Sequence, residues 1–203
     1  HMWAPDVYEG APTSVTVFFA TLPKVAALTV LIRFLYVPFG NMIDQWQMIV
    51  VFLSIASMIF GAVAAIGQKN LKRLIAYSSI GHMGYALAGL STGTNSGLQS
   101  SITYMSIYIF MNLSFFSCLF MLRRKNNYFE NLEDLSGLSK KHPLLAFCFL
   151  VALFSLAGIP PLAGFFAKFY VFMAVIEEKM YFLAVVGLLS TVIAAFYYLR
   201  IIK

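Results

Sequence analysis

Two lysines stand inside stretches of sequence that are otherwise apolar and long enough to cross a membrane. Lys24 lies about midway along the apolar residues 13–37, and Lys168 lies within a second apolar stretch, residues 144–177. An ammonium group near the middle of a bilayer costs roughly 2.5–3.5 kcal/mol on insertion scales, so it is rare there and usually faces a polar interior. Burial also disfavours the charged form of a lysine, which favours exchange of its proton. Together the two lysines indicate a path for protons or other ions.

A histidine is the third candidate for proton exchange. His82 lies in the apolar stretch that begins near residue 75, beside a stripe of small residues, Ser78, Gly81 and Gly84. The stripe predicts that a neighbouring helix approaches closely. A neutral imidazole can pass a proton between its two nitrogens near physiological pH. A packed, hydrogen-bonded histidine is the alternative interpretation.

Pro23 directly precedes Lys24 and changes the hydrogen bonding of the same helical turn. Because proline has no backbone N–H, the carbonyl of Phe19, four residues earlier, loses its helical donor. We expect this carbonyl to accept a hydrogen bond from water or from a neighbouring side chain.

Lys168 follows a segment that a continuous helix is not expected to cross. The apolar residues 144–177 would form a helix of about 50 Å at 1.5 Å per residue, whereas the hydrocarbon core is about 30 Å thick. Near the middle stand four helix-breaking residues: Gly158, Pro160, Pro161 and Gly164. We predict a broken helix between the two glycines, of the kind that marks ion or substrate sites in transporters. A kink with no mechanistic role is the alternative.

The composition predicts an integral membrane protein built of helices. Of the 203 residues, 61% are hydrophobic and 11% are charged, whereas soluble domains carry about 25% charged residues. A membrane-spanning helix needs about 20 mainly apolar residues. Six segments come near this length, at residues 13–37, 46–66, 75–92, 100–122, 144–177 (broken) and 180–200. We expect residues 1–203 to form a single all-α membrane domain, a polytopic bundle of transmembrane helices.

The basic residues gather on alternate links between these segments. They occupy the link after the second segment, the link after the fourth and the end of the sequence: Lys69, Lys72, Arg73, Arg123, Arg124, Lys125, Lys140, Lys141, Arg200 and Lys203. If each segment crosses once, these residues share one side of the membrane. The positive-inside rule predicts that this is the cytoplasmic side, and that the polar loop 123–142 lies there too.

The sequence offers no recognisable metal or cofactor site. No spacing of cysteine and histidine fits a zinc, iron–sulfur or haem site, and no glycine-rich loop fits a nucleotide. We therefore expect no metal and no cofactor in this chain. Cys118 and Cys148 both fall in apolar segments, and we interpret them as small buried hydrophobic residues. The net charge of +6 does not indicate a nucleic-acid partner, because the positive charges alternate with apolar segments.

Four stretches resemble, in order, the antiporter-like membrane subunits of respiratory complex I, the NADH–quinone oxidoreductase. They are HMWAPDVYEGAP at the start, SIASMIFG from residue 54, LKRLIAYSSIGHMGY from residue 71 and LAGIPPLAGFFAKFY from residue 156. The form DVYEGAP is most similar to subunit N, the bacterial counterpart of mitochondrial subunit 2. The family motif at the start includes His1, Trp3, Pro5 and Asp6.

The resemblance implies a proton-translocating, non-redox subunit of an enzyme complex, with no complete active site and no cofactor of its own. It matches Lys24 to the mid-membrane lysine of the family, Lys168 to the lysine of the second broken helix, and His82 to the polar position between them. Protons would pass along these side chains and water, coupled to quinone reduction elsewhere in the complex. The family's first repeat, with its acid–lysine pair, is not in the sequence. We expect the partners to be a missing N-terminal half, other membrane subunits of complex I and the lipid bilayer.

Two other functions stay open at this point. A multisubunit cation/proton antiporter subunit shares the broken-helix lysine, and a structural membrane fragment would conduct nothing. The expected location is the bacterial inner (plasma) membrane, crossed several times, with an organelle inner membrane as the alternative.

Overall fold

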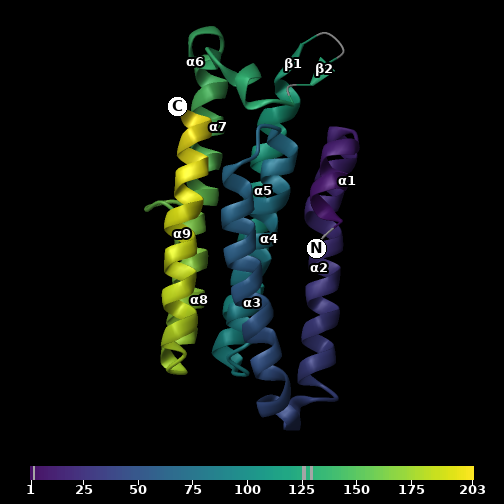
Figure 1. The fold of residues 1–203 in the computed structure, drawn as a ribbon, viewed down its shortest axis with the longest axis vertical. Coiled ribbons are helices and arrows are strands. Elements are labelled where there is room, and N and C mark those ends of the chain that lie inside the picture. Colours follow the sequence, from purple (N-terminus) through teal and green to yellow (C-terminus); the bar gives the residue numbers. More distant parts are fainter. Residues whose placement is uncertain (2, 125–126, 129) are drawn as a thin grey trace.

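The computed structural model describes residues 1, 3–124, 127–128 and 130–203. Side chains are described for residues 1, 3–122 and 130–203. These residues form a bundle of upright helices with a small polar segment at one end, made of the described residues between Arg123 and Lys141, which we call the cap (Figure 1). The elements are α1 (Ala4–Gly10), α2 (Thr13–Tyr36), η1 (Gly40–Met42), α3 (Ile43–Ile66), α4 (Leu71–Leu90), α5 (Asn95–Met121), β1 (Arg123–Arg124), β2 (Asn127–Tyr128), η2 (Leu132–Leu135), α6 (Leu138–Lys141), α7 (Pro143–Ala157), α8 (Ala163–Glu177) and α9 (Tyr181–Ile202). The predicted all-α fold is confirmed, since the two described strands are a two-residue antiparallel pair in the cap.

Four of the described helices are long and apolar enough to cross a membrane: α2, α3 with η1, α5 and α9. The expected long segment 144–177 is split into α7 and α8, each of 15 residues. At 1.5 Å per residue each half is about 22 Å long, so neither spans a bilayer alone. The two halves together take the place of one crossing.

The central helix of the bundle is α4, which packs against α1, α2, α3, α5, α8 and α9. Nearly all of its residues are buried, including the polar Ser78, Ser79 and His82. It begins at Leu71 because the side chain of Asn70 accepts a hydrogen bond from the N–H of Arg73 at 3.1 Å, which satisfies one of the free donors of the first turn. Polar groups that lipid would not tolerate are therefore gathered on a helix that other helices surround.

The predicted close approach at the small-residue stripe is confirmed, and the partner is α3. A Cβ added to Gly61 would lie 2.5 Å from the backbone nitrogen of Gly81, and one added to Gly84 would lie 2.9 Å from the carbonyl oxygen of Ser54. The Ser54 hydroxyl donates to the carbonyl of Gly84 at 2.7 Å. Glycines on both helices thus let the backbones meet.

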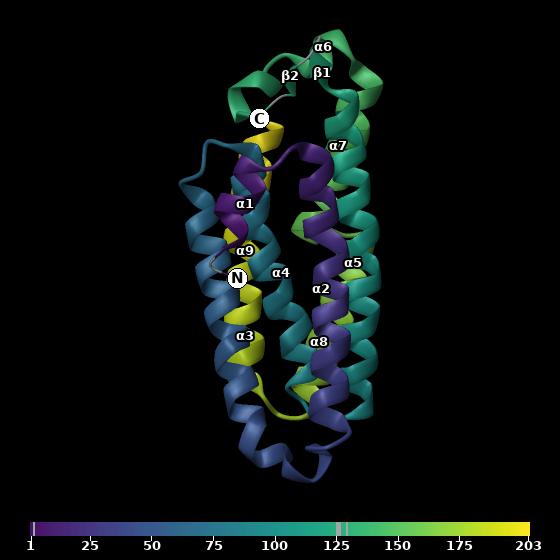
Figure 2. The ribbon, with the colours of Figure 1, turned by 90° about the vertical axis from the view of Figure 1, so that its right-hand side faces the viewer.

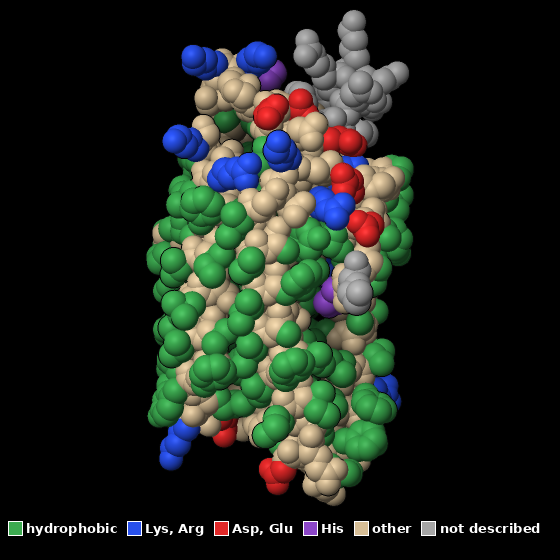
Figure 3. Space-filling view, viewed as in Figure 1, with side chains coloured by type: hydrophobic (Ala, Val, Ile, Leu, Met, Phe, Trp, Pro, Cys, Tyr) green, Lys and Arg blue, Asp and Glu red, His purple; other side chains and the backbone are tan. Residues whose placement is uncertain are grey.

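The outer surface of the bundle is apolar along most of its length (Figure 3). Side chains such as Phe52 and Val192 are 68% and 70% exposed. The expectation of two buried cysteines is wrong for one of them, because Cys118 is buried and Cys148 is exposed on α7. The physical reason is that lipid is as apolar as the bundle interior, so an apolar helix presents hydrophobic residues in both directions.

The two basic links lie at one end, as predicted from their charge. The N–H of Leu71 donates to the carbonyl of Glu130 at 2.7 Å, and the N–H of Leu132 donates to the carbonyl of Lys69 at 3.1 Å. Lysine and arginine side chains gather at this end in Figure 3, around the cap. Lys125, which was assigned to the same side, lies outside the described residues.

Candidate functional site

Lys24 points into the bundle from α2 and is 5% exposed. Its Nζ donates to the hydroxyl of Tyr108, on α5, at 3.1 Å. The same ammonium lies 5.3 Å from the ring centroid of Tyr8 and 5.5 Å from that of Tyr108. The faces of tyrosine rings attract a cation, so two rings and one hydroxyl replace part of the water that the group leaves.

The carbonyl that Pro23 leaves without a helical donor has a side-chain partner. The hydroxyl of Tyr8, from α1, donates to the carbonyl of Phe19 at 3.2 Å. The expectation of a side-chain or water donor here is confirmed. This bond holds the Tyr8 ring beside the ammonium of Lys24, and so connects the helix disturbance to the position of the lysine.

His82 is 4% exposed and both of its ring nitrogens face tyrosine hydroxyls. Nδ1 lies 2.6 Å from the hydroxyl of Tyr104, on α5, and Nε2 lies 3.3 Å from the hydroxyl of Tyr198, on α9. The Tyr198 hydroxyl is in turn hydrogen-bonded to the hydroxyl of Ser78. In a neutral imidazole one nitrogen donates and the other accepts, so this arrangement satisfies either tautomer.

Lys168 lies on α8 and is 4% exposed, and its side chain reaches across the break to the end of α7. Its Nζ donates to the carbonyl of Ala157, the last residue of α7, at 2.9 Å. The ammonium also lies 5.0 Å from the ring centroid of Tyr85, on α4. A cation is favoured at the C-terminus of a helix, where the carbonyl groups carry a partial negative charge.

The predicted break is confirmed between Gly158 and Gly164, and both glycines have a steric reason. Gly158 has φ +85°, and a Cβ there would lie 3.0 Å from Cδ and 3.1 Å from Nζ of Lys168. A Cβ on Gly164 would lie 1.8 Å from the carbonyl oxygen of Ser155, a distance at which any side chain would clash with this backbone. Pro160 and Pro161, joined by a cis peptide, form the connection. The break therefore leaves room for Lys168 to reach the end of α7.

The three predicted residues come from different helices and are linked by tyrosines. The hydroxyl of Tyr108 accepts the hydrogen bond from Lys24. The centroid of the Tyr108 ring lies 5.1 Å from that of the His82 ring. The His82 ring lies 6.4 Å from that of Tyr85, whose face is turned to Lys168. We call this series (Lys24, Tyr108, His82, Tyr85, Lys168) the buried row. Its members come from α2, α4, α5 and α8, which pack against one another in the bundle (Figure 2).

A small cavity adjoins one half of the buried row. It is lined by Ser78, His82, Tyr85, Lys168 and Ser190 among others, and its volume is about 10 Å³. Such a space is near the limit for holding one water molecule. Apolar residues such as Met58 and Ala62 also line it, and the polar side chains among the lining residues are possible hydrogen-bond partners for a water molecule.

No carboxylate pairs with either lysine of the row in the part of the chain that the structure describes. The ion pairs found there belong to Lys72, with Glu130 at 2.9 Å, and to Arg73, with Glu9 at 2.7 Å and Asp6 at 3.1 Å. Among the described residues, the partners of the two buried ammonium groups are neutral dipoles and aromatic faces. Their protonation is sensitive to any charge that appears nearby.

The residues of the opening motif lie outside the buried row. Pro5 is buried, whereas His1, Trp3 and Asp6 are exposed. Asp6 joins α1 to the start of α4 through its ion pair with Arg73. In this structure the motif positions α1, and α1 contributes Tyr8 to the surroundings of Lys24.

Sequence reasoning missed the tyrosines, although α5 carried a signal for them. Ser101, Tyr104, Tyr108 and Asn112 recur at intervals of three or four residues, which places them on one helical face. All four are at most 1% exposed. A polar stripe inside an otherwise apolar span indicates the face that is turned away from lipid.

Comparison with known proteins places this arrangement in a family. Residues 1–194 match the family model described as NADH:quinone oxidoreductase/Mrp antiporter, TM. The chain is 79% identical over 203 residues to the NADH-quinone oxidoreductase subunit N of Pelagibacter ubique (strain HTCC1062) and 56% identical to that of Rhodospirillum rubrum. It covers 43% and 42% of the length of these relatives.

Solved structures show the same fold in two kinds of complex. A chain of the Mrp complex from Dietzia sp. DQ12-45-1b matches with a TM-score of 0.90 at 27% identity, over 99% of this chain and 37% of that one. A chain of respiratory complex I from Thermus thermophilus with bound aureothin matches with a TM-score of 0.83 at 38% identity, over 98% of this chain and 43% of that one. The chain belongs to the family of membrane subunits shared by NADH:quinone oxidoreductases and Mrp antiporters.

Proposed function

We propose that this chain is part of a proton-translocating membrane subunit of a NADH–quinone oxidoreductase, of the kind named subunit N. The observation that carries the proposal is the buried row, a series of titratable and hydroxyl-bearing side chains in the bundle interior that are joined by hydrogen bonds and ring contacts. The chain would take no part in electron transfer, and quinone reduction would occur in other subunits. The proposed location is the bacterial inner membrane, with other membrane subunits of the complex as neighbours.

The first half of the row would pass a proton between Lys24 and His82. The ammonium of Lys24 donates to the Tyr108 hydroxyl at 3.1 Å, and a hydroxyl can accept one proton while it donates its own. The Tyr108 and His82 rings are in contact. Because that contact is not a hydrogen bond, we propose that a water molecule or a rotation of the Tyr108 side chain completes this step.

The second half would use the imidazole and the small cavity. His82 faces hydroxyl groups through both nitrogens, so it can receive a proton on one side and release it on the other. The cavity, lined by His82, Tyr85 and Lys168, would hold the water that carries the proton to Lys168. The carbonyl of Ala157 then holds the protonated amine at the helix break.

Coupling would act through charge. A unit charge that appears about 8 Å from an unpaired lysine changes its energy by roughly 2 kcal/mol at an effective dielectric constant of about 20. That is about a 30-fold change in the ratio of protonated to neutral amine. Neither lysine of the row has a carboxylate partner among the described residues, so no ion pair among them would oppose such a change.

A cation/proton antiporter is the second candidate, favoured by the likeness in fold to the Mrp complex. The higher sequence identity to relatives named subunit N, 79% against 27%, supports the oxidoreductase. The two are distinguished in liposomes that contain the complete complex and a pH-sensitive dye. We expect NADH-driven acidification to be the same in sodium-free choline buffer and in sodium buffer. Acidification that needs sodium, or that a sodium gradient drives without NADH, would favour the antiporter.

A further inference from the structure

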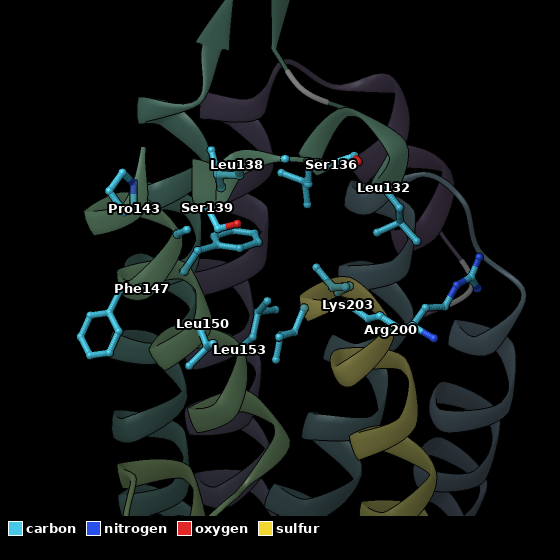
Figure 4. A pocket seen from close by; sticks show the side chains of 16 residues that line it. Leu132, Ser136, Leu138, Ser139, Pro143, Phe147, Leu150, Leu153, Arg200 and Lys203 are labelled. Carbon is cyan, nitrogen blue, oxygen red and sulfur yellow. The ribbon is translucent and has the colours of Figure 1, made fainter. Parts of the chain in front are cut away.

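A large cavity opens at the basic end of the bundle, away from the buried row. It has a volume of about 520 Å³ and lies between the cap, the first turns of α7 and the last turn of α9 (Figure 4). This is within the usual size range of ligand sites, about 300–1,000 Å³. The proposed proton path uses none of its residues.

The wall of the cavity is apolar on the side that continues into the helices. Leu150 and Leu153 of α7 and Ile201 of α9 line it, together with Leu132 of η2 and Leu138 of α6. Figure 4 shows Leu150 and Leu153 at the floor, toward the membrane-spanning part of the bundle. A hydrocarbon chain would be favoured on such a surface, because apolar groups leave water on contact with it.

The rim of the cavity is basic. Arg200 and Lys203 line it, and α6, which contributes Leu138 and Ser139, also carries the exposed Lys140 and Lys141. Arg200 donates one hydrogen bond to the carbonyl of Ile66, at 2.8 Å. Because a guanidinium has five N–H donors, the others stay available to a ligand. No acidic side chain is among the described lining residues.

Two acidic residues stand on the neighbouring turn η2, and neither of them lines the cavity. Asp134 accepts hydrogen bonds from the backbone N–H groups of Glu130 and Asn131, and Glu133 is exposed to solvent. The start of α7 adds a favourable partial charge, since none of the described side chains caps it. Arg200 offsets the opposite partial charge of the α9 C-terminus, as it lies in the last turn.

From this juxtaposition we propose that the cavity binds an anionic phospholipid, with its phosphate at Arg200 and Lys203 and an acyl chain between α7 and α9. The combination of a basic rim and an apolar floor that descends into the membrane matches the two ends of a lipid molecule. The rim is on the side that the positive-inside rule assigns to the cytoplasm, and the cytoplasmic leaflet is the one that presents anionic headgroups. A lipid here would fix the cap to the broken helix.

The test uses the complete subunit in its complex, delipidated in neutral detergent, with phosphatidylglycerol as the probe and native mass spectrometry as the readout. Each basic side chain near a headgroup contributes about fivefold in affinity, so Arg200→Gln with Lys203→Gln should weaken binding about 25-fold. Lys69→Gln removes an exposed charge from the same end but outside the cavity, and it should leave binding within about twofold. Phosphatidylcholine should bind much more weakly than phosphatidylglycerol.

A second variant tests the floor and does not depend on charge. Leu150→Trp fills the space between α7 and α9, and we expect it to reduce retention of phosphatidylglycerol while the melting temperature stays near the parental value. The proposal is overturned if the double variant or Leu150→Trp binds phosphatidylglycerol like the parent, or if phosphatidylcholine binds equally well. It is also overturned if a structure of the complete complex shows a protein segment in the cavity.

Discussion

Replacing Gly158 by alanine would place a methyl group against the side chain of Lys168. Gly158 ends α7 in the left-handed region, with φ +85° and ψ +36°, where an L-residue costs about 1–2 kcal/mol more than glycine. The added carbon would lie 3.0 Å from Cδ and 3.1 Å from Nζ of Lys168. Since an ordinary contact is longer, the lysine has to move away from the end of α7.

The size of the effect follows from the bond that this movement weakens. Nζ of Lys168 donates to the carbonyl of Ala157 at 2.9 Å, and a hydrogen bond from a charged group contributes about 1.5–3 kcal/mol. Loss of half of a bond at the upper end of this range, about 1.4 kcal/mol, corresponds to a tenfold change in occupancy of the protonated state at this site. We therefore expect Gly158→Ala to lower the rate of proton pumping by about tenfold and the stability by about 1–2 kcal/mol.

The assay is proton uptake per NADH oxidised, by the complete complex in liposomes, with thermal unfolding measured in parallel. Gly137→Ala is the matched control, because Gly137 has φ +75° and no atom within 4 Å of an added Cβ. It carries a similar backbone strain without touching Lys168. We expect Gly137→Ala to pump at the parental rate. If Gly158→Ala pumps no worse than Gly137→Ala, the reasoning about the position of Lys168 is refuted.

Two further substitutions test the row and the packing that surrounds it. Tyr108→Phe removes the hydroxyl that accepts a hydrogen bond from Lys24, and it should slow proton pumping several-fold. The control Tyr181→Phe, at a residue that is 58% exposed, should leave the pumping rate unchanged. If both variants pump at the same rate, Tyr108 is not part of the path. Gly61→Ala should lower the stability by about 1–3 kcal/mol, because the methyl group would meet the α4 backbone at 2.5 Å. Gly67→Ala is the control, because an added Cβ there meets nothing within 4 Å, and it should change the melting temperature little. A similar loss of stability in both variants would contradict the close packing of α3 on α4.

The features that could be predicted from the sequence are those set by local chemistry. A lysine is costly in a membrane whatever surrounds it, so Lys24 and Lys168 could be expected to face inward. The break of the fifth segment follows from Pro160 and Pro161 and from its length. The free carbonyl of Phe19 follows from Pro23 alone. Each of these depends on a residue and its near neighbours in the chain.

The partners of the site could not be predicted in the same way, because they depend on which face of each helix turns inward. Lipid and bundle interior are both apolar, so hydrophobicity does not distinguish the two faces. For this reason Cys148 was wrongly expected to be buried. Tyr8, Tyr104 and Tyr198 come from three different helices, and only the packing of these helices around α4 shows that they meet Lys24 and His82.

The central claim is tested most directly by replacing each lysine of the row with methionine and measuring proton pumping by the complete complex. Lys24→Met and Lys168→Met keep the length and the apolar packing of the side chain and remove its proton site. The measurement is the number of protons moved per NADH oxidised, with assembly followed by native gel electrophoresis. The account predicts that both variants assemble and that each pumps fewer protons than the parent. If both assemble and pump the parental number of protons, the buried row is not the path.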